Sequence, residues 1–456
     1  MDEGLWNYLL EESMKQNLGN DKISKLLLKL SIPAILGMLS SAIFNIVDRA
    51  YVGMISSYGL TAVGITMPIQ VIQMAFILLI GIGTSSLISI KLGEGKKEEA
   101  EDILYLALKY IILFLIGFAV LFMIFIDPIL NLLAISEQVM PYAKVYIIII
   151  VVGSIIGIPG YCLNNSLRSI GQASSSMKII IITSVINIIL DPIFIFVFDM
   201  GIAGAAIATV ISQFILTVYV VLAFIKRRDF MIHLRIRKVD REWVKVKSFM
   251  HMGLPSFYVQ ILAAVVNIYL NNSLLKYGTD LDIAATTIMS SIFGFYHMII
   301  VGIVQGNNAI CGYNYGAKQF LRVRKSLELA LLSSLLLSLA LFFIIFIFPQ
   351  ILVGLFTKEI ELLELTSQGM KYYLSMIPLV GLQTVSSQYF QVVGKARKSS
   401  ILAFLRYGII IIPSIFILAP RFGVIGIYAS NAISDGIASV VAIGFIVLEI
   451  RRLRTL

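Results

Sequence analysis

The chain has 456 residues, of which 59% are hydrophobic and only 14% are charged, and its formal net charge is +10. Soluble globular proteins carry about 25% charged residues, so this composition excludes a soluble domain and indicates an integral membrane protein. Apolar stretches of about 20 residues or more recur along the whole length, which excludes a single membrane anchor, and the first stretch is too long for a cleaved signal peptide.

The order of apolar and polar segments predicts an all-α membrane protein with twelve transmembrane helices. Residues 4–15 alternate apolar and charged groups at helical spacing, so they form either an amphipathic segment at the membrane surface, with Trp6 at the interface, or an ordinary tail. The predicted spans follow at about 26–51, 59–90, 100–126, 137–163, 172–198, 202–226, 248–276, 283–313, 324–348, 361–393, 399–420 and 422–448.

The positive charges predict that both termini are cytoplasmic. Of the 36 Lys and Arg residues, about 28 fall in the termini and the alternate loops on one side, and about 4 fall in the loops on the other side. Because cytoplasmic loops carry an excess of these residues, both termini are placed on that side and the number of spans is even. The same distribution accounts for the net charge without nucleic acid as a partner.

An internal repeat divides the predicted spans into two six-helix lobes. Pairs of motifs share an offset of 222 or 223 residues: Ser31-Ile-Pro33 with Gly253-Leu-Pro255, Gly83 and Gly93 with Gly306 and Gly316, Gly171 with Gly394, and Gly201 and Gly204 with Gly423 and Gly426. We predict an N-terminal lobe at 1–225, a basic cytoplasmic linker at 226–247 and a C-terminal lobe at 248–456. Such repeats are typical of transporters in which two lobes move about a central cavity.

Asn187 and Asp191 are the most informative pair of polar residues in an apolar span. They lie four residues apart, so both side chains are on one face of a helix and can converge on one small ligand. Pro192 has no N–H for the carbonyl of Ile188, which can leave a backbone oxygen available at the same place. An ionisable group at membrane depth predicts a functional site, and the alternative is an Asp held by a neighbouring helix for structural reasons.

Carboxylates inside the predicted spans are distributed unequally between the lobes. Asp48 and Asp191 belong to the N-terminal lobe, whereas the repeat places Leu270 and Pro413 at the matching positions of the C-terminal lobe. The lobes are thus alike in shape and unlike in charge. This difference predicts that ion coupling takes place in the N-terminal lobe, with Asp435 as a third carboxylate in the other lobe.

The coupling ion is left open between H⁺ and Na⁺. A pair of buried carboxylates can hold a proton near neutral pH, because burial and a like charge both favour the protonated form. Together with Asn187 and the hydroxyl group of Thr209, the same carboxylates can supply hard oxygen ligands to Na⁺. Cys162 and Cys311 lie far apart in apolar segments and predict packing rather than a metal site, and the chain has only 3 His, so we expect no other metal and no cofactor.

The motifs resemble those of the multidrug and toxic compound extrusion (MATE) transporters, and within them the DinF-like branch of bacteria and archaea. The resemblance covers all predicted spans. The motifs that carry it are Phe44-Asn45-Ile-Val-Asp48-Arg-Ala-Tyr-Val-Gly53, Leu92-Gly93-Glu-Gly95, Asn187-x3-Asp191-Pro192, Gly201-x2-Gly204-Ala-Ala-x-Ala-Thr209 and Gly312-Tyr-Asn-Tyr-Gly316-Ala-Lys.

The resemblance implies roles for five residues. Relatives of that branch form a cation or proton site in the N-terminal lobe from positions that match Asp48, Asn187, Asp191 and Thr209, and they bend the first helix at a position that matches Pro33. Other branches place an acidic residue in the seventh span. Residues 255–267 contain none, so the resemblance does not extend to a cation site in the C-terminal lobe.

The family exports organic cations and amphipathic drugs, which implies a cavity of aromatic and thioether surfaces with few fixed charges. Asp435 is expected either to touch a cationic substrate or to hydrogen-bond a neighbour, and Arg406 is expected to extend from the end of its span toward the membrane surface. The candidate cavity residues are Met67, Gln70, Tyr146, Tyr161, Asn164, Met289, Tyr296 and Asp435.

The predicted function is a multidrug efflux antiporter of the prokaryotic plasma membrane that exchanges H⁺ or Na⁺ for drug, acts as a monomer, and has small cationic or amphipathic substrates and membrane lipids as its partners. The main alternative is a flippase for a lipid-linked saccharide or another lipid, a related class that commonly has extra spans and several cations in its cavity. An intramembrane protease is disfavoured because Val47 precedes Asp48 and Leu190 precedes Asp191, so no enzyme activity is expected. A passive channel would need polar residues along a continuous path, and the polar positions here are sparse.

Overall fold

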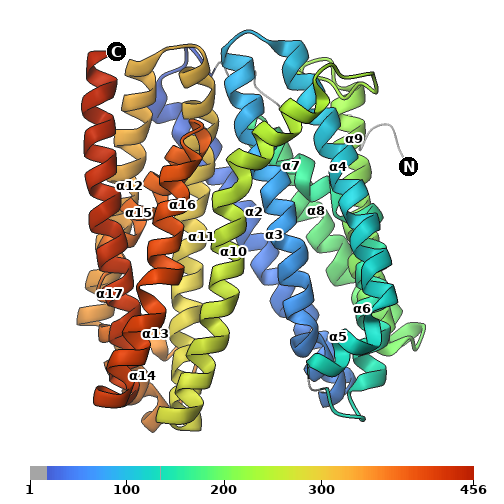
Figure 1. Ribbon diagram of the computed structural model, residues 1–456. Coiled ribbons are helices and arrows are strands. Elements are labelled where there is room, and N and C mark those ends of the chain that lie inside the picture. The colour runs from blue at the N-terminus through green and yellow to red at the C-terminus, as the bar shows by residue number, and fades with distance from the viewer. Residues whose placement is uncertain (1–17, 134) are drawn as a thin grey trace. The chain divides into compact units, whose positions relative to one another are not determined.

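The computed structural model describes residues 18–133 and 135–456, and the regular structure in these ranges is helical throughout (Figure 1). The predicted amphipathic segment 4–15, with Trp6, lies outside the described residues. The chain divides into two compact units, of which the first contains Leu36–Gly253 and the second contains Gly19–Ile35 together with Leu254–Leu456. The boundaries therefore fall inside two helices rather than in the basic linker.

The helices of the first half of the chain follow the predicted spans, with some interruptions. They are α2 (Ile23–Ile55), α3 (Ser57–Gly93), α4 (Lys97–Ile124), α5 (Ile126–Leu132), α6 (Met140–Gly157), α7 (Pro159–Ser169), α8 (Ala173–Pro192), the π-helix η1 (Ile193–Val197), α9 (Gly201–Lys226) and α10 (Glu242–Tyr277). Ser56 ends α2 and begins α3, because its extended backbone leaves the helix and its hydroxyl group accepts a hydrogen bond of 2.9 Å from the N–H of Gly59.

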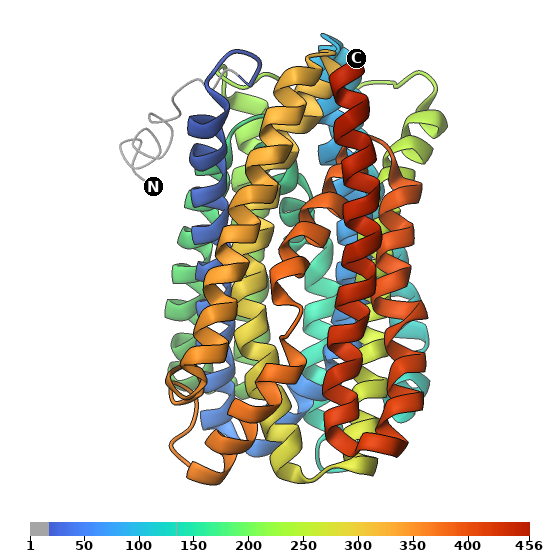
Figure 2. The same cartoon turned by 90° about the vertical axis from the view of Figure 1, so that its left-hand side faces the viewer.

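The helices of the second half are also interrupted. They are α11 (Asp280–Gly316), α12 (Phe320–Ile347), α13 (Pro349–Val353), α14 (Ile360–Tyr373), α15 (Ile377–Val392), α16 (Ala396–Phe404), the π-helix η2 (Leu405–Ile409) and α17 (Ile411–Thr455). Gly423, with φ 58° and ψ −138°, breaks α17 into two arms, and the chain turns back there (Figure 2). Such a positive φ is accessible to glycine because it has no Cβ.

Ten helices in the described ranges are long and apolar enough to cross a membrane. This number differs from the twelve predicted spans at two places. The apolar run predicted as the span 361–393 is broken into α14 and α15, each shorter than a membrane span. The spans 399–420 and 422–448 follow one another without a gap across the turn at Gly423, so they count as a single stretch from Ala396 to Thr455 although they form two arms. The predicted span 137–163 is likewise divided, between α6 and α7, where Pro159 begins a new helix.

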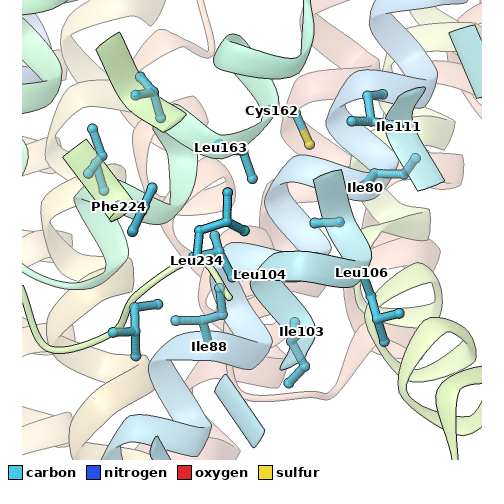
Figure 3. Close-up of a cluster of buried hydrophobic side chains, with 14 of the residues drawn as sticks. Ile80, Ile88, Ile103, Leu104, Leu106, Ile111, Cys162, Leu163, Phe224 and Leu234 are labelled. Atoms are coloured by element: carbon cyan, nitrogen blue, oxygen red, sulfur yellow. The ribbon is translucent and has the colours of Figure 1, made fainter. Parts of the chain in front are cut away.

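A buried apolar cluster holds the first unit together. It includes Ile80, Leu104, Leu163 and Phe224, which come from α3, α4, α7 and α9 and face one another in Figure 3. Leu234, from the basic stretch between α9 and α10, packs into the same cluster. The linker is therefore part of the first unit's core, because its apolar side chains are removed from water there.

Acidic side chains hold the linker in place as well. Asp102, near the start of α4, accepts hydrogen bonds of 2.6 Å from both Arg237 and Lys245. Glu242 accepts a hydrogen bond of 2.7 Å from Lys109. The hydrogen bond to Asp102 raises the pKa of Arg237, which lies outside the candidate spans. Several of the linker cations are thus neutralised within the chain, and the charge of the linker is not all available to lipid.

Two helices each belong to both units. Residues 23–35 of α2 lie in the second unit and the rest of α2 lies in the first, with Pro33 near the change. In α10 the change falls between Gly253 and Leu254, next to Pro255. The internal repeat matches Pro33 with Pro255. Each repeat therefore begins with a helix that changes unit: α2 starts in the second unit and continues in the first, and α10 starts in the first unit and continues in the second.

Glycine residues allow the first parts of α2 and α10 to pack closely against neighbouring helices. In the first unit, a Cβ on Gly253 of α10 would lie 1.8 Å from the carbonyl oxygen of Leu79, and a Cβ on Gly83 of α3 would lie 2.0 Å from that of Phe249. In the second unit, a Cβ on Gly306 of α11 would lie 2.4 Å from the hydroxyl oxygen of Ser31 in α2. Small residues at helix crossings let the backbones approach, which is how helices associate in membranes.

Candidate functional site

Asn187 and Asp191 lie on one face of α8 in the first unit, as their spacing predicts, and both are buried, at 1% and 0% exposure. The amide nitrogen of Asn187 lies 3.5 Å from the hydroxyl oxygen of Thr209 on α9. With the amide turned to match its neighbours, its nitrogen donates to a carboxylate oxygen of Asp191 at 3.0 Å and its oxygen accepts from the N–H of Thr209 at 3.3 Å. Asn187 therefore links Asp191 to the neighbouring helix.

The helix changes form immediately after this pair. Pro192 is the last residue of α8, and the chain continues as the π-helix η1. The N–H of Phe198 bonds to the carbonyl of Ile193, five residues earlier. Proline removes a backbone donor and crowds the preceding turn, and π-turns are frequent at functional sites. The irregular backbone begins at Ile193, two residues after Asp191.

Asp48 joins the same region from α2. Its carboxylate is half-buried, and it lies close enough to Asp191 for the two charges to repel each other. The first unit thus brings together Asp48, Asn187, Asp191 and Thr209, which we call the carboxylate–amide cluster. Within the described residues no group of three or more His, Cys, Asp or Glu side chains could hold a metal ion. The oxygen atoms of two carboxylates, an amide and a hydroxyl suit a proton or a hard monovalent cation.

Three of the predicted cavity residues lie beside the cluster. Tyr146 on α6 is 6% exposed and interacts with the side chain of Gln70 on α3. It also lies near enough to Asp48 and Asp191 for their charges to act on it. Met67, also on α3, is 40% exposed, and its sulfur atom accepts a long contact of 3.9 Å from Arg49. This end of the first unit therefore presents an aromatic ring, an amide and a thioether next to the acids.

The other predicted cavity residues lie within the packing of their own units. Tyr161 on α7 packs against the apolar cluster of the first unit, and Asn164 is buried at 1% exposure. Met289 and Tyr296, on α11 in the second unit, are 0% and 3% exposed. The hydroxyl group of Tyr296 is 2.6 Å from that of Ser338, so it is already satisfied by the protein.

Asp435 is paired with Arg406, which was expected to extend away from it toward the membrane surface. Arg406 donates from Nε to the carboxylate at 2.7 Å and from Nη1 to the amide oxygen of Gln383 at 3.2 Å. The prediction that Arg406 extends to the membrane surface is wrong, because its side chain is buried at 6% exposure inside the second unit. Asp435 was expected either to touch a cationic substrate or to hydrogen-bond a neighbour, and in the structure it accepts a hydrogen bond from its neighbour Arg406.

A signal for this pair was present in the sequence. Arg406 lies 17 residues before the turn at Gly423 and Asp435 lies 12 residues after it, so the antiparallel arms carry both charges inside the second unit. Opposite charges in the interiors of consecutive spans are a pattern for an intramembrane ion pair. The guanidinium group is also held over the rings of Phe293 and Tyr407, at 5.7 Å and 4.9 Å from their centroids.

Comparison with known proteins gives matches over almost the whole chain. The MatE family profile matches residues 33–193 and 255–449. The chain is 27% identical over 430 residues to the multidrug export protein MepA of Staphylococcus aureus (strain MSSA476), and the alignment covers 92% of each protein.

Solved structures agree with the fold. One, described as the outward-facing conformation of a multidrug resistance MATE family transporter of the MOP superfamily, has a TM-score of 0.89 at 24% identity and covers 97% of this chain and 99% of that one. Another, described as MATE in the bent conformation, has a TM-score of 0.89 at 23% identity and covers 95% and 97%. These similarities establish the fold.

Proposed function

The chain belongs to the MatE family, and we propose that it is a multidrug efflux transporter that exports cationic or amphipathic compounds in exchange for H⁺ or Na⁺. The family resemblance in the sequence motifs is confirmed, whereas the branch within the family stays a prediction. The family is one of transporters and not of enzymes. The many apolar helices and the bacterial relatives support a multi-pass protein, for which we propose the plasma membrane, twelve spans and cytoplasmic termini.

The observation that carries the proposal is the environment of Asp191. Its carboxylate is 0% exposed, its hydrogen-bonding neighbour is the neutral Asn187, and the nearby charge is that of Asp48, which has the same sign. Arg49 offsets part of the charge of the half-buried Asp48. Keeping Asp191 buried and charged beside this second acid is still costly, so a proton or Na⁺ gains free energy by binding between them. Binding neutralises the pair, and release restores the repulsion.

Binding at this cluster offers a way to couple the ion to drug. The cluster joins α2, α8 and α9, and the candidate substrate residues Met67, Gln70 and Tyr146 lie beside it in the same unit. A cation at Asp48 and Asp191 changes which groups Asn187 and Thr209 bond, and it competes electrostatically with a cationic drug at the same surface. In the proposed alternating access, ion entry therefore favours drug release to the outside.

The test is dye uptake into inside-out proteoliposomes, driven separately by an imposed pH gradient and an imposed Na⁺ gradient. We expect one of the two gradients to drive uptake of a fluorescent cationic dye, and both Asp48→Asn and Asp191→Asn to abolish it. Asp199→Asn is the matched control, because Asp199 follows η1 in the same unit and is exposed. Near-normal transport by either cluster variant would contradict the site, and no uptake under both gradients would favour a lipid-linked substrate instead.

A further inference from the structure

We propose that a pocket between the starts of α2 and α12, in the second unit, binds the phosphate-bearing head group of an anionic phospholipid. The cavity has a volume of about 580 Å³. Figure 2 shows the first turns of α2, in dark blue, beside α12, in gold. The side chains that carry the argument are Lys22, Ser24, Arg322, Lys325, Leu329 and Leu332, all of which line the pocket.

Two of the cations are available to a ligand. Lys22 and Lys325 are exposed, and in the part of the chain that the structure describes neither makes an ion pair. An ammonium group at the membrane surface attracts anionic lipid, and clusters of such groups mark lipid head-group sites. Ser24, with a hydroxyl group that can donate to a phosphate oxygen, lines the same pocket.

Arg322 adds a guanidinium group in a fixed position. Its Nε donates to the amide oxygen of Asn314 at 3.0 Å, and its Nη2 donates to the carbonyl oxygen of Asp21 at 2.7 Å. The bond to Asp21 ties α12 to the chain just before α2 and holds the two walls of the pocket together, and the bond to Asn314 ties α12 to α11. The carboxylate of Asp21 also acts electrostatically on Arg322, so the proposal depends on Lys22 and Lys325 for its unpaired charge.

The acidic residue of the pocket is already paired. Glu328 lines the cavity, and its carboxylate accepts a bond of 2.7 Å from Arg324, four residues earlier on α12. Its negative charge is therefore neutralised by a cation that does not line the cavity, and the lining cations remain available. The helix starts work in the same direction, because α2 begins at Ile23 and α12 at Phe320, and the unpaired N–H groups of a helix N-terminus favour an anion.

The apolar surface below the cations selects a lipid rather than a soluble anion. Leu329 and Leu332 follow Lys325 by four and seven residues, so they continue the same face of α12 away from the helix start. Leu332 is 52% exposed, and Leu28 and Ile32, further along α2, are 60% and 51% exposed. A phosphate at the basic end and acyl chains on these side chains would satisfy both parts of the surface.

The proposal is tested by native mass spectrometry of the full chain, delipidated in detergent and titrated with phosphatidylglycerol. We expect one tightly retained phosphatidylglycerol, and a roughly tenfold or greater weakening of its binding in Lys22→Gln/Lys325→Gln, since each lost cation removes part of the attraction. The control is Lys238→Gln/Lys247→Gln, which removes the same charge from exposed positions of the linker and should leave the binding unchanged.

Other outcomes would overturn the proposal. Equal weakening in the two double variants would mean that only net charge matters, and equal retention of zwitterionic phosphatidylcholine would mean that the pocket does not read the head-group charge. Thermal stabilisation by inorganic phosphate without an effect of phosphatidylglycerol would assign the pocket to a soluble anion. Because binding is read directly, none of these outcomes depends on the proposed transport.

Discussion

Asp191 and Asp435 are both buried acids, but their partners differ, and the difference separates function from support. Asp191 is hydrogen-bonded to a neutral amide, whereas Asp435 is bonded to Arg406 and is already neutralised. A buried charge without a countercharge favours uptake of a cation, and a buried ion pair does not. The exchange of ions is therefore expected at Asp191, and Asp435 is expected to stabilise the second unit.

A double-mutant cycle on the buried pair tests this assignment. Asp435→Asn leaves the guanidinium of Arg406 buried without its carboxylate, and such a loss destabilises by about 3–5 kcal/mol. Arg406→Gln/Asp435→Asn removes both charges, so we expect it to be markedly more stable than Asp435→Asn alone in a chemical or thermal unfolding measurement. Additive effects of the two substitutions would show that the pair is not coupled.

At the scale of helices, glycine contacts decide how closely the crossing segments pack. Gly253→Ala would place a methyl group 1.8 Å from the carbonyl oxygen of Leu79, a backbone atom that cannot turn aside. We expect a loss of at least about 2 kcal/mol in the free energy of unfolding, or failure to fold.

The matched control for that substitution lies in the same unit. Gly117, in α4, has nothing within 4 Å of the position of an added Cβ. Gly117→Ala should therefore leave stability unchanged or raise it by up to about 1 kcal/mol, because alanine favours a helix. A melting temperature that falls equally in the two variants would argue against the close crossing as the cause.

At the scale of the whole molecule, Pro33 lies where α2 passes from one unit to the other. A proline leaves a carbonyl in the preceding turn without its helical donor, so α2 bends there more easily than elsewhere. We expect Pro33→Ala to reduce the turnover of dye transport more than dye affinity, because a straighter helix resists movement of the units. Pro420→Ala is the control, since Pro420 lies in α17 with the second unit on both sides. Equal turnover in Pro33→Ala and the unmodified protein would remove the bending step.

The sequence predicted the membrane class and the family because these depend on hydropathy and on residues of fixed spacing. It also predicted that Asn187 and Asp191 share one face of a helix, since both lie on one unbroken turn. It did not predict the pairing of Arg406, because the rule for arginine near the end of a span considers only the distance to water and not a partner on another helix. Hydropathy also does not reveal the breaks between α6 and α7 or between α14 and α15, because apolar residues continue across both breaks.

The first part of α2 packs on residues that the ribosome makes much later. Ser31 donates a hydrogen bond to the carbonyl of Ile303, a residue 272 positions further along the chain. During synthesis this segment has to wait in the membrane while the whole of the first unit is inserted, with its small face uncovered and exposed to other helices. The segment gains its partner only when α11 arrives, and α12 to α17 then complete the second unit around a segment from the beginning of the chain.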